Sequence, residues 1–171
     1  MGQASTSRDI TTKRAGAAVD YQALSVADKI TRRNNSAVAV FPGRMVIRDT
    51  DDLSAKIQDS GVVLGAGEFY HGLVMDNTNR ERVQGSSATA GYLQNELIPI
   101  ARTGRFYAEC EEAVAEGDTV WVRFVAGAGG SIIGKVRGDV DTASAEAINA
   151  KFAQTITAAG LVAIDLNMPQ V

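Results

Sequence analysis

The sequence has few of the residues that mark a secreted, membrane-spanning or catalytic protein. It contains one cysteine, Cys110, so no disulfide can form within the chain and nothing marks an oxidising compartment. It also contains one histidine, His71, on which any catalytic triad or histidine-rich metal site would have to depend. No apolar run approaches the length of a membrane span, about 18 residues, and residues 1–14 lack the apolar stretch of a signal peptide. We therefore expect the protein to work in aqueous surroundings and to bind no membrane.

Proline, aromatic residues and positive charge are also scarce. The chain has 3 prolines, 6% aromatic residues and a net charge of -3, against 17 glycines. A nucleic-acid-binding protein needs a basic surface to neutralise phosphates, so this charge argues against such a partner. The many glycines favour a fold with many turns. At 171 residues, one domain with a well-buried core is the expected organisation.

The clearest structural signal lies in residues 105–137. Apolar and polar side chains alternate there with a period of two, which places successive side chains on opposite faces of a strand. The inward set comprises Phe106, Ala108, Cys110, Val120, Val122 and Phe124. Short glycine-containing segments at 117–118 and 127–130 separate the runs, as tight turns require. This stretch predicts three strands at the centre of the fold.

The rest of the chain predicts further strands and little helix. Short strands are expected on both sides of Pro42, and over 62–64, 68–75, 97–101 and 161–166, with a long exposed loop over 76–92. Short helices are predicted over 21–33 and 143–157. The fold class is therefore mainly β, a single β-barrel or β-sandwich-like domain over 37–171. An extended N-terminal arm with a short helix precedes it over 1–36.

None of the candidate catalytic, cofactor-binding or metal-binding motifs in the sequence has all the residues that its chemistry requires. We interpret His71 as a packed strand residue and Cys110, which lies between two glutamates, as a core residue. Residues 129–135, GGSIIGK, lack the hydroxyl residue that a phosphate-binding loop needs after its lysine, because Val136 stands there. The aspartates at 49–52 lack the glycine and distal glutamate of a calcium loop. We predict that the protein is not an enzyme and has no cofactor and no metal.

Several segments resemble the structural cement, or head decoration, proteins of tailed bacteriophages. The matching segments are Phe41–Val46, Glu68–Met75 with the polar residues 76–78, Gly104–Tyr107 with Ala113–Arg123, and Ile148–Phe152 followed by Ala159–Leu166. The likeness covers about residues 38–168. A glycine and aspartate followed by alternating valines also occurs in lipoyl and biotinyl domains. Those domains carry an acceptor lysine at a hairpin tip, whereas this chain has no lysine between Lys56 and Lys135.

The resemblance implies a non-enzymatic protein that binds the outside of a phage head. Its expected partners are the major capsid protein, whose subunits it would bridge, and itself, as a homotrimer rather than a dimer. It would be made in the host cytoplasm and end on the capsid surface of the virion. The arm and the 76–92 loop are the expected contact regions. The candidate partner-binding residues are Arg8, Lys13, Arg14, Arg32, Arg33, Asn77, Asn79, Arg80 and Arg82.

A second hypothesis is a small carbohydrate- or surface-binding β module, also on a virion. Four aromatic side chains would then offer stacking surfaces to a ligand. These are Tyr70, Tyr92, Tyr107 and Trp121. Burial of Trp121 would weaken this hypothesis.

Overall fold

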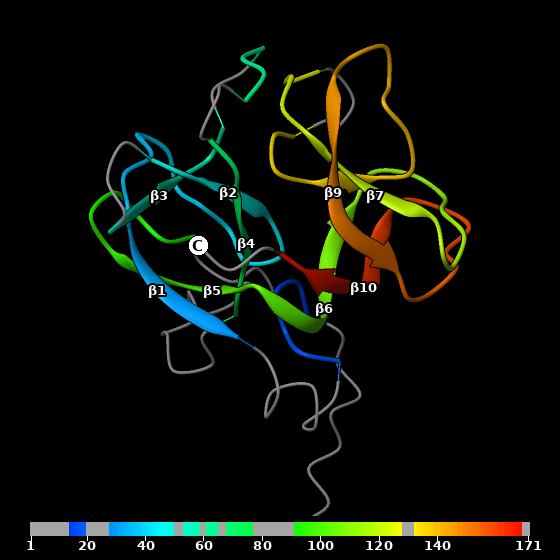
Figure 1. Cartoon of the computed structure of the whole chain (residues 1–171), viewed down its shortest axis with the longest axis horizontal. Coiled ribbons are helices and arrows are strands. Elements are labelled where there is room, and N and C mark those ends of the chain that lie inside the picture. Colours follow the sequence, from blue (N-terminus) through cyan, green and yellow to red (C-terminus); the bar gives the residue numbers. More distant parts are fainter. Residues whose placement is uncertain are drawn as a thin grey trace, which may run out of the picture.

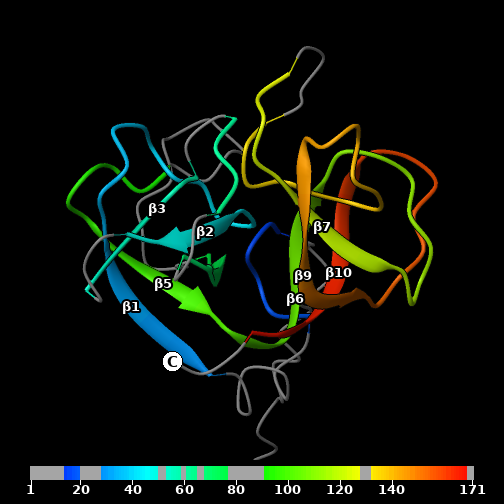
Figure 2. The same ribbon diagram turned by 45° about the horizontal axis from the view of Figure 1, so that its top comes forward.

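The computed structural model describes residues 14–19, 28–49, 53–58, 61–64, 68–76, 91–127 and 132–168. This part of the chain forms ten strands and no helix, which confirms the prediction of a mainly β protein. The strands form two closed five-stranded barrels, where the sequence predicted a single barrel or sandwich. The barrels lie side by side (Figures 1 and 2).

The N-terminal barrel is built from the first five strands. Their order around the barrel is β1-β3-β2-β4-β5, and antiparallel pairing of β5 with β1, from Lys29↔Ala101 to Arg33↔Leu97, closes the ring. The strands are β1 (Lys29–Asn34), β2 (Met45–Arg48), β3 (Ser54–Lys56), β4 (Tyr70–Val74) and β5 (Leu97–Ala101).

The C-terminal barrel contains the stretch that the sequence marked as central. Its order is β10-β6-β8-β7-β9, closed by antiparallel pairing of β10 with β9. The strands are β6 (Thr103–Cys110), β7 (Thr119–Arg123), β8 (Val136–Arg137), β9 (Ala145–Phe152) and β10 (Gly160–Asn167). The inward residues predicted for 105–137 are buried, with Phe106 and Val120 both 0% exposed.

The predicted helix over 143–157 is wrong, because this segment contains β9. From Ile148 onward the buried residues recur at every second position, Ile148, Ala150 and Phe152, as in a strand with one covered face. Alanine, glutamate and lysine favour helix only weakly, and pairing with β7 and β10 overrides that preference. The helix predicted over 21–33 is wrong in its second half, because Lys29–Asn34 forms strand β1. Residues 21–27 lie outside the described part of the chain.

The two barrels share a core. One cluster of buried side chains joins Met45 and Leu73 of the N-terminal barrel to Phe106 and Val122 of the C-terminal barrel. The chain passes from β5 to β6 through a single residue, Arg102, so no linker in the sequence marks a boundary between the barrels. The burial of apolar surface between the barrels makes them one packed unit.

Backbone hydrogen bonds cross the joint between the barrels at several points. The Met45 N–H donates to the Gly134 carbonyl (2.8 Å), and the Glu109 N–H donates to the Gly43 carbonyl (3.1 Å). A Cβ atom on Gly134 would lie 2.9 Å from the Met45 carbonyl oxygen, so glycine permits this close approach. Arg44 also forms an ion pair with Glu109 (3.4 Å).

Residues 14–19 lie across the same joint, and we call this segment the clasp. The Gly16 N–H donates to the Tyr107 carbonyl on β6 (2.7 Å). The Gly16 carbonyl accepts from the N–H of Asp76, which follows β4 (3.1 Å). The clasp therefore holds both barrels at once, and it fastens the N-terminal segment to the body of the protein.

Candidate interaction surfaces

The nine candidate partner-binding residues fall into two groups. Arg14, Arg32 and Arg33 lie in the described part of the chain. Arg14 belongs to the clasp and pairs with Asp76 at 3.8 Å, while the two others lie on β1. The remaining six, Arg8, Lys13, Asn77, Asn79, Arg80 and Arg82, lie outside the described residues. Their role in partner binding stays a prediction.

The outer face of β1 carries polar and basic side chains. Lys29, Thr31 and Arg33 are exposed, whereas Ile30 and Arg32 are half-buried. Arg32 folds along the strand, where its Nη1 donates to the Thr31 carbonyl (3.1 Å). The three outward side chains therefore form a row that a partner can contact directly.

Three exposed leucines surround the end of β1, and we call them the leucine patch. Leu53, Leu93 and Leu97 are 75%, 60% and 68% exposed. Leu97 pairs with Arg33 in the sheet, and the Leu53 carbonyl accepts from the Arg33 N–H (2.9 Å). The Leu93 carbonyl accepts from Asn34 Nδ2 (3.1 Å), which brings the third leucine to the same place. Large apolar side chains that are exposed close to one another are a feature of protein-interaction surfaces.

The leucine patch did not figure among the residues predicted from the sequence. A signal for one member was present, because alternation in 97–101 places Ile98 and Ile100 inward and so turns Leu97 outward. Leu53 and Leu93 come from connections between strands. Only the closure of the barrel brings them beside Leu97.

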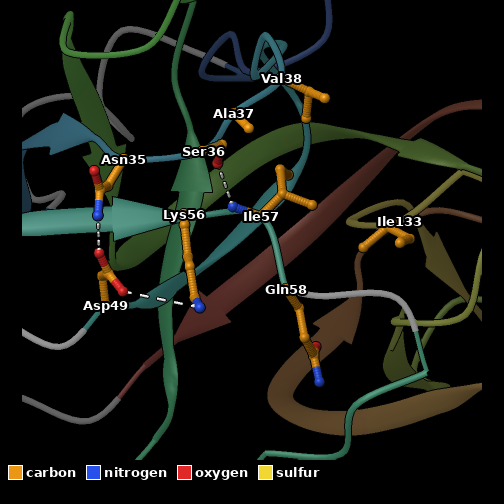
Figure 3. A pocket seen from close by; sticks show the side chains of 9 residues that line it. All are labelled: Asn35, Ser36, Ala37, Val38, Asp49, Lys56, Ile57, Gln58 and Ile133. Carbon is orange, nitrogen blue, oxygen red and sulfur yellow. Dashed lines mark hydrogen bonds and ion pairs between the residues drawn. The ribbon is translucent and has the colours of Figure 1, made fainter.

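A pocket of ≈ 410 Å³ opens between the barrels (Figure 3). Ile133 comes from the C-terminal barrel, and the other lining residues come from the N-terminal barrel. Asp49 accepts a hydrogen bond from Asn35 and forms an ion pair with Lys56 at 3.8 Å (Figure 3). Ser36 Oγ accepts from the Ile57 N–H (2.7 Å). These bonds use the charged groups of the pocket for internal contacts.

A charged cluster links β7 and β8 of the C-terminal barrel to the segments that follow β6 and β8. Arg123 Nε donates to Glu111 Oε2 (2.5 Å) and Arg123 Nη2 donates to Asp141 Oδ2 (2.5 Å). Arg137 pairs with Glu112 (3.0 Å) and with Asp141 (2.9 Å). The side chains of Arg123 and Glu111 are 5% and 7% exposed, so each charge depends on the others for its solvation.

The charged cluster shifts the pKa values of two of its members. The hydrogen bond from Arg123 lowers the pKa of Asp141 below its ordinary value. Burial opposes the charge of Arg123, but the hydrogen bonds to Glu111 and Asp141 outweigh it and raise the pKa of Arg123. A depressed aspartate pKa stabilises the fold above the ordinary aspartate pKa, and this contribution is lost as the pH falls through the folded-state value. The cluster is thus a structural feature of the barrel.

The residues with catalytic potential are packed into the fold. His71 is 4% exposed on β4 and meets Phe69 edge-on, with ring centroids 5.3 Å apart. Burial raises the pKa of Cys110, so its thiol is a poor nucleophile. Burial and the nearby charge of Glu146 also raise the pKa of Tyr70. Among the described residues, no cluster of histidine, cysteine and acidic side chains could hold a metal, and no helix could cross a membrane.

Two of the four aromatic residues proposed for carbohydrate stacking are buried. Tyr70 is 5% exposed and bonds to Gln58 Oε1, while Tyr92 is 2% exposed and donates to the Met75 carbonyl (3.0 Å). Neither ring can stack on a ligand. Trp121 and Tyr107 are half-buried on β7 and β6. The four aromatic residues therefore do not form one exposed surface on which a carbohydrate could stack.

Comparison with known proteins identifies the family. The model of a family described as structural cement protein (E217 gp24/Pam3 gp6) matches residues 3–167. The chain belongs to this structural cement protein family. The match also includes most of the N-terminal arm, which the sequence resemblance over 38–168 left out. No curated protein matches the chain.

Solved structures support the fold of this cement protein. A chain from the structure titled the capsid of Myoviridae Phage XM1 aligns with a TM-score of 0.65 at 18% identity, covering 90% of the cement protein and 89% of that chain. The head fiber gp8.5 N base of bacteriophage phi29 aligns at a TM-score of 0.41 and 11% identity, over 85% of the cement protein and 98% of that chain. Only the first of these similarities is close enough to indicate a shared fold. Membership of the family supports a structural rather than a catalytic role.

Proposed function

We propose that this cement protein binds the outer surface of a phage head and bridges neighbouring major capsid protein subunits. The observation that carries the proposal is the family match over residues 3–167. A ligand that binds only the assembled shell stabilises the assembled state by mass action. Contacts with more than one capsid subunit add avidity. The protein would thus stabilise the shell without making or breaking a covalent bond.

The shape of the molecule suits this role. Two barrels that share a core offer a rigid body, and rigidity limits the entropy lost when a protein binds. The leucine patch lies at the end of β1 in the N-terminal barrel, beside the basic residue Arg33. We propose that the leucine patch and the outer face of β1 are the main capsid contacts. Self-association as a homotrimer, centred on a symmetry axis of the shell, would present several such patches at once.

Truncations of the arm test whether it takes part in attachment. We expect deletion of residues 2–13 to leave stability unchanged, because it keeps the clasp, yet to weaken capsid binding by about tenfold or more through lost avidity. Deletion of residues 2–19 should also lower the melting temperature, since it removes the Gly16 bonds to both barrels. Cosedimentation with capsids that lack the protein measures binding, and thermal unfolding measures stability. Full capsid occupancy by the 2–13 deletion would contradict a role for residues 2–13 in attachment.

A further inference from the structure

The clasp pairs with β6 through one antiparallel bridge, Ala18↔Phe106, and the backbone hydrogen bonds that flank it. The Tyr107 N–H donates to the Ala17 carbonyl (2.9 Å), and the Val19 N–H donates to the Arg105 carbonyl (3.1 Å). These bonds use the edge of β6 opposite β10. On the same edge β8 pairs only at Cys110↔Val136, so the part of the edge from Arg105 to Tyr107 is covered by the clasp. Addition of a strand to a sheet edge is a common way for one polypeptide to bind another, because main-chain groups supply the affinity.

The position of Gly16 makes the site selective for this segment. Gly16 has φ 74°, and a Cβ atom there would lie 2.4 Å from the Val74 carbonyl oxygen and 2.7 Å from the Asp76 nitrogen. A segment with any other residue at this point would have to move out of the joint. The site therefore fits residues 14–19 of this chain, supplied by the same copy or by another.

The two points that residues 20–27 connect lie close together on β6. Val19 bonds to Arg105, while the Asp28 N–H donates to Thr103 Oγ1 (2.9 Å), so the two ends meet β6 two residues apart, roughly 7 Å along the strand. Residues 20–27 connect these ends and can span roughly 28 Å when extended. The extended length of this connection exceeds the separation of its two ends, so the connection does not by itself confine the clasp to its own chain.

We propose that the clasp exchanges between copies, so that residues 14–19 of one molecule dock on β6 of the next. The exchanged contacts are the same as those within one chain, so exchange takes place in concentrated solution as well as on a shell. High local concentration on a shell would favour exchange and link neighbouring copies through their backbones. This inference goes beyond capsid binding and can be tested on the isolated protein.

The test traps the exchanged clasp with a disulfide between two full-length chains. Ala17 and Tyr107 are half-buried and flank the Ala18↔Phe106 bridge, and the Tyr107 N–H donates to the Ala17 carbonyl. Residues next to each other across an antiparallel pair are about 4.5–5.5 Å apart at Cα, which is within the range of a disulfide. Chains carrying Ala17→Cys and chains carrying Tyr107→Cys, with different tags, are coexpressed, purified and oxidised. We expect links between the two tags to exceed those of a control pair, Ala17→Cys with Ala158→Cys, by about tenfold or more, because docking concentrates the thiols. Ala158 is exposed and lies just before β10, away from the clasp.

Two further results complete this experiment. The doubly substituted chain, Ala17→Cys/Tyr107→Cys, should form its disulfide, and failure to do so would contradict the pairing of the clasp with β6. Links in the mixed pair at the level of the Ala158→Cys control would overturn exchange and show that each clasp docks only on its own chain. Native Cys110 is 3% exposed and should take no part.

Discussion

We expect Gly72→Ala to prevent stable folding. Gly72 lies in β4, between β2 and β5, with φ 145°, a conformation that side chains rarely adopt. A Cβ atom there would lie 2.1 Å from the Ala101 carbonyl oxygen, which the β4–β5 ladder holds in place. Backbone must move to relieve this clash in a fully buried strand, so we expect a loss of about 4 kcal/mol or more. Total stabilities are about 5–15 kcal/mol, so most of the fold's stability would be lost.

Gly117→Ala is the matched control for this prediction. Gly117 also has a positive φ, 89°, but no atom lies within 4 Å of the position of its Cβ. Its substitution should cost only the backbone strain, about 1 kcal/mol. Urea unfolding of the two variants and the unchanged protein measures the difference. Equal stability of the Gly72→Ala and Gly117→Ala variants would show that β4 does not pack against β5 in this way.

Glu111→Gln should give the second large loss of stability, about 3 kcal/mol. Glu111 Oε2 accepts from Arg123 and Oε1 accepts from the Ile132 N–H (3.0 Å), so this one carboxylate joins the charged cluster to the β7–β8 connection. Removing its charge leaves Arg123 buried with a single anionic partner, Asp141. Breaking a buried ion pair from one side is much more costly than breaking an exposed one.

Asp165→Asn, which removes an exposed ion pair, is the control for Glu111→Gln, which removes a buried one. Arg105 and Asp165 form a pair of good geometry at 2.7 Å, but their side chains are 46% and 47% exposed. Water and salt screen such a pair, so its loss should cost less than about 1 kcal/mol. Chemical denaturation at neutral pH measures both variants. If Glu111→Gln were as mild as Asp165→Asn, the charged cluster would not contribute to the stability of the barrel.

The sequence was most informative over residues 105–137. Alternation over 105–137 correctly placed Phe106, Cys110 and Val122 in the core, because a period of two has a single structural meaning in a half-buried strand. The same rule applied to Ile148–Phe152 would have indicated β9. Helix propensity competes with that rule in this segment, but its small free energies are outweighed by pairing with two neighbouring strands.

The number of barrels and the interaction surfaces could not be predicted from local pattern. Closure of a sheet depends on pairs distant in sequence, such as Lys29↔Ala101, and no local signal records which strands will meet. The leucine patch arises from that closure. The clasp depends on Gly16, whose neighbours Val74 and Asp76 are distant in the sequence. The sequence around Gly16 therefore does not show that a glycine is required there.

Binding to an assembled shell is tested most directly by adding the purified cement protein to phage heads from which it is absent. The heads are sedimented over a range of protein concentrations, and the copies bound per head are counted, with dissociated capsid subunits as the comparison. We predict saturable binding of a fixed number of copies to intact heads and much weaker binding to free subunits. Binding that never saturates, or that does not exceed the level of an unrelated protein, would contradict a cementing role.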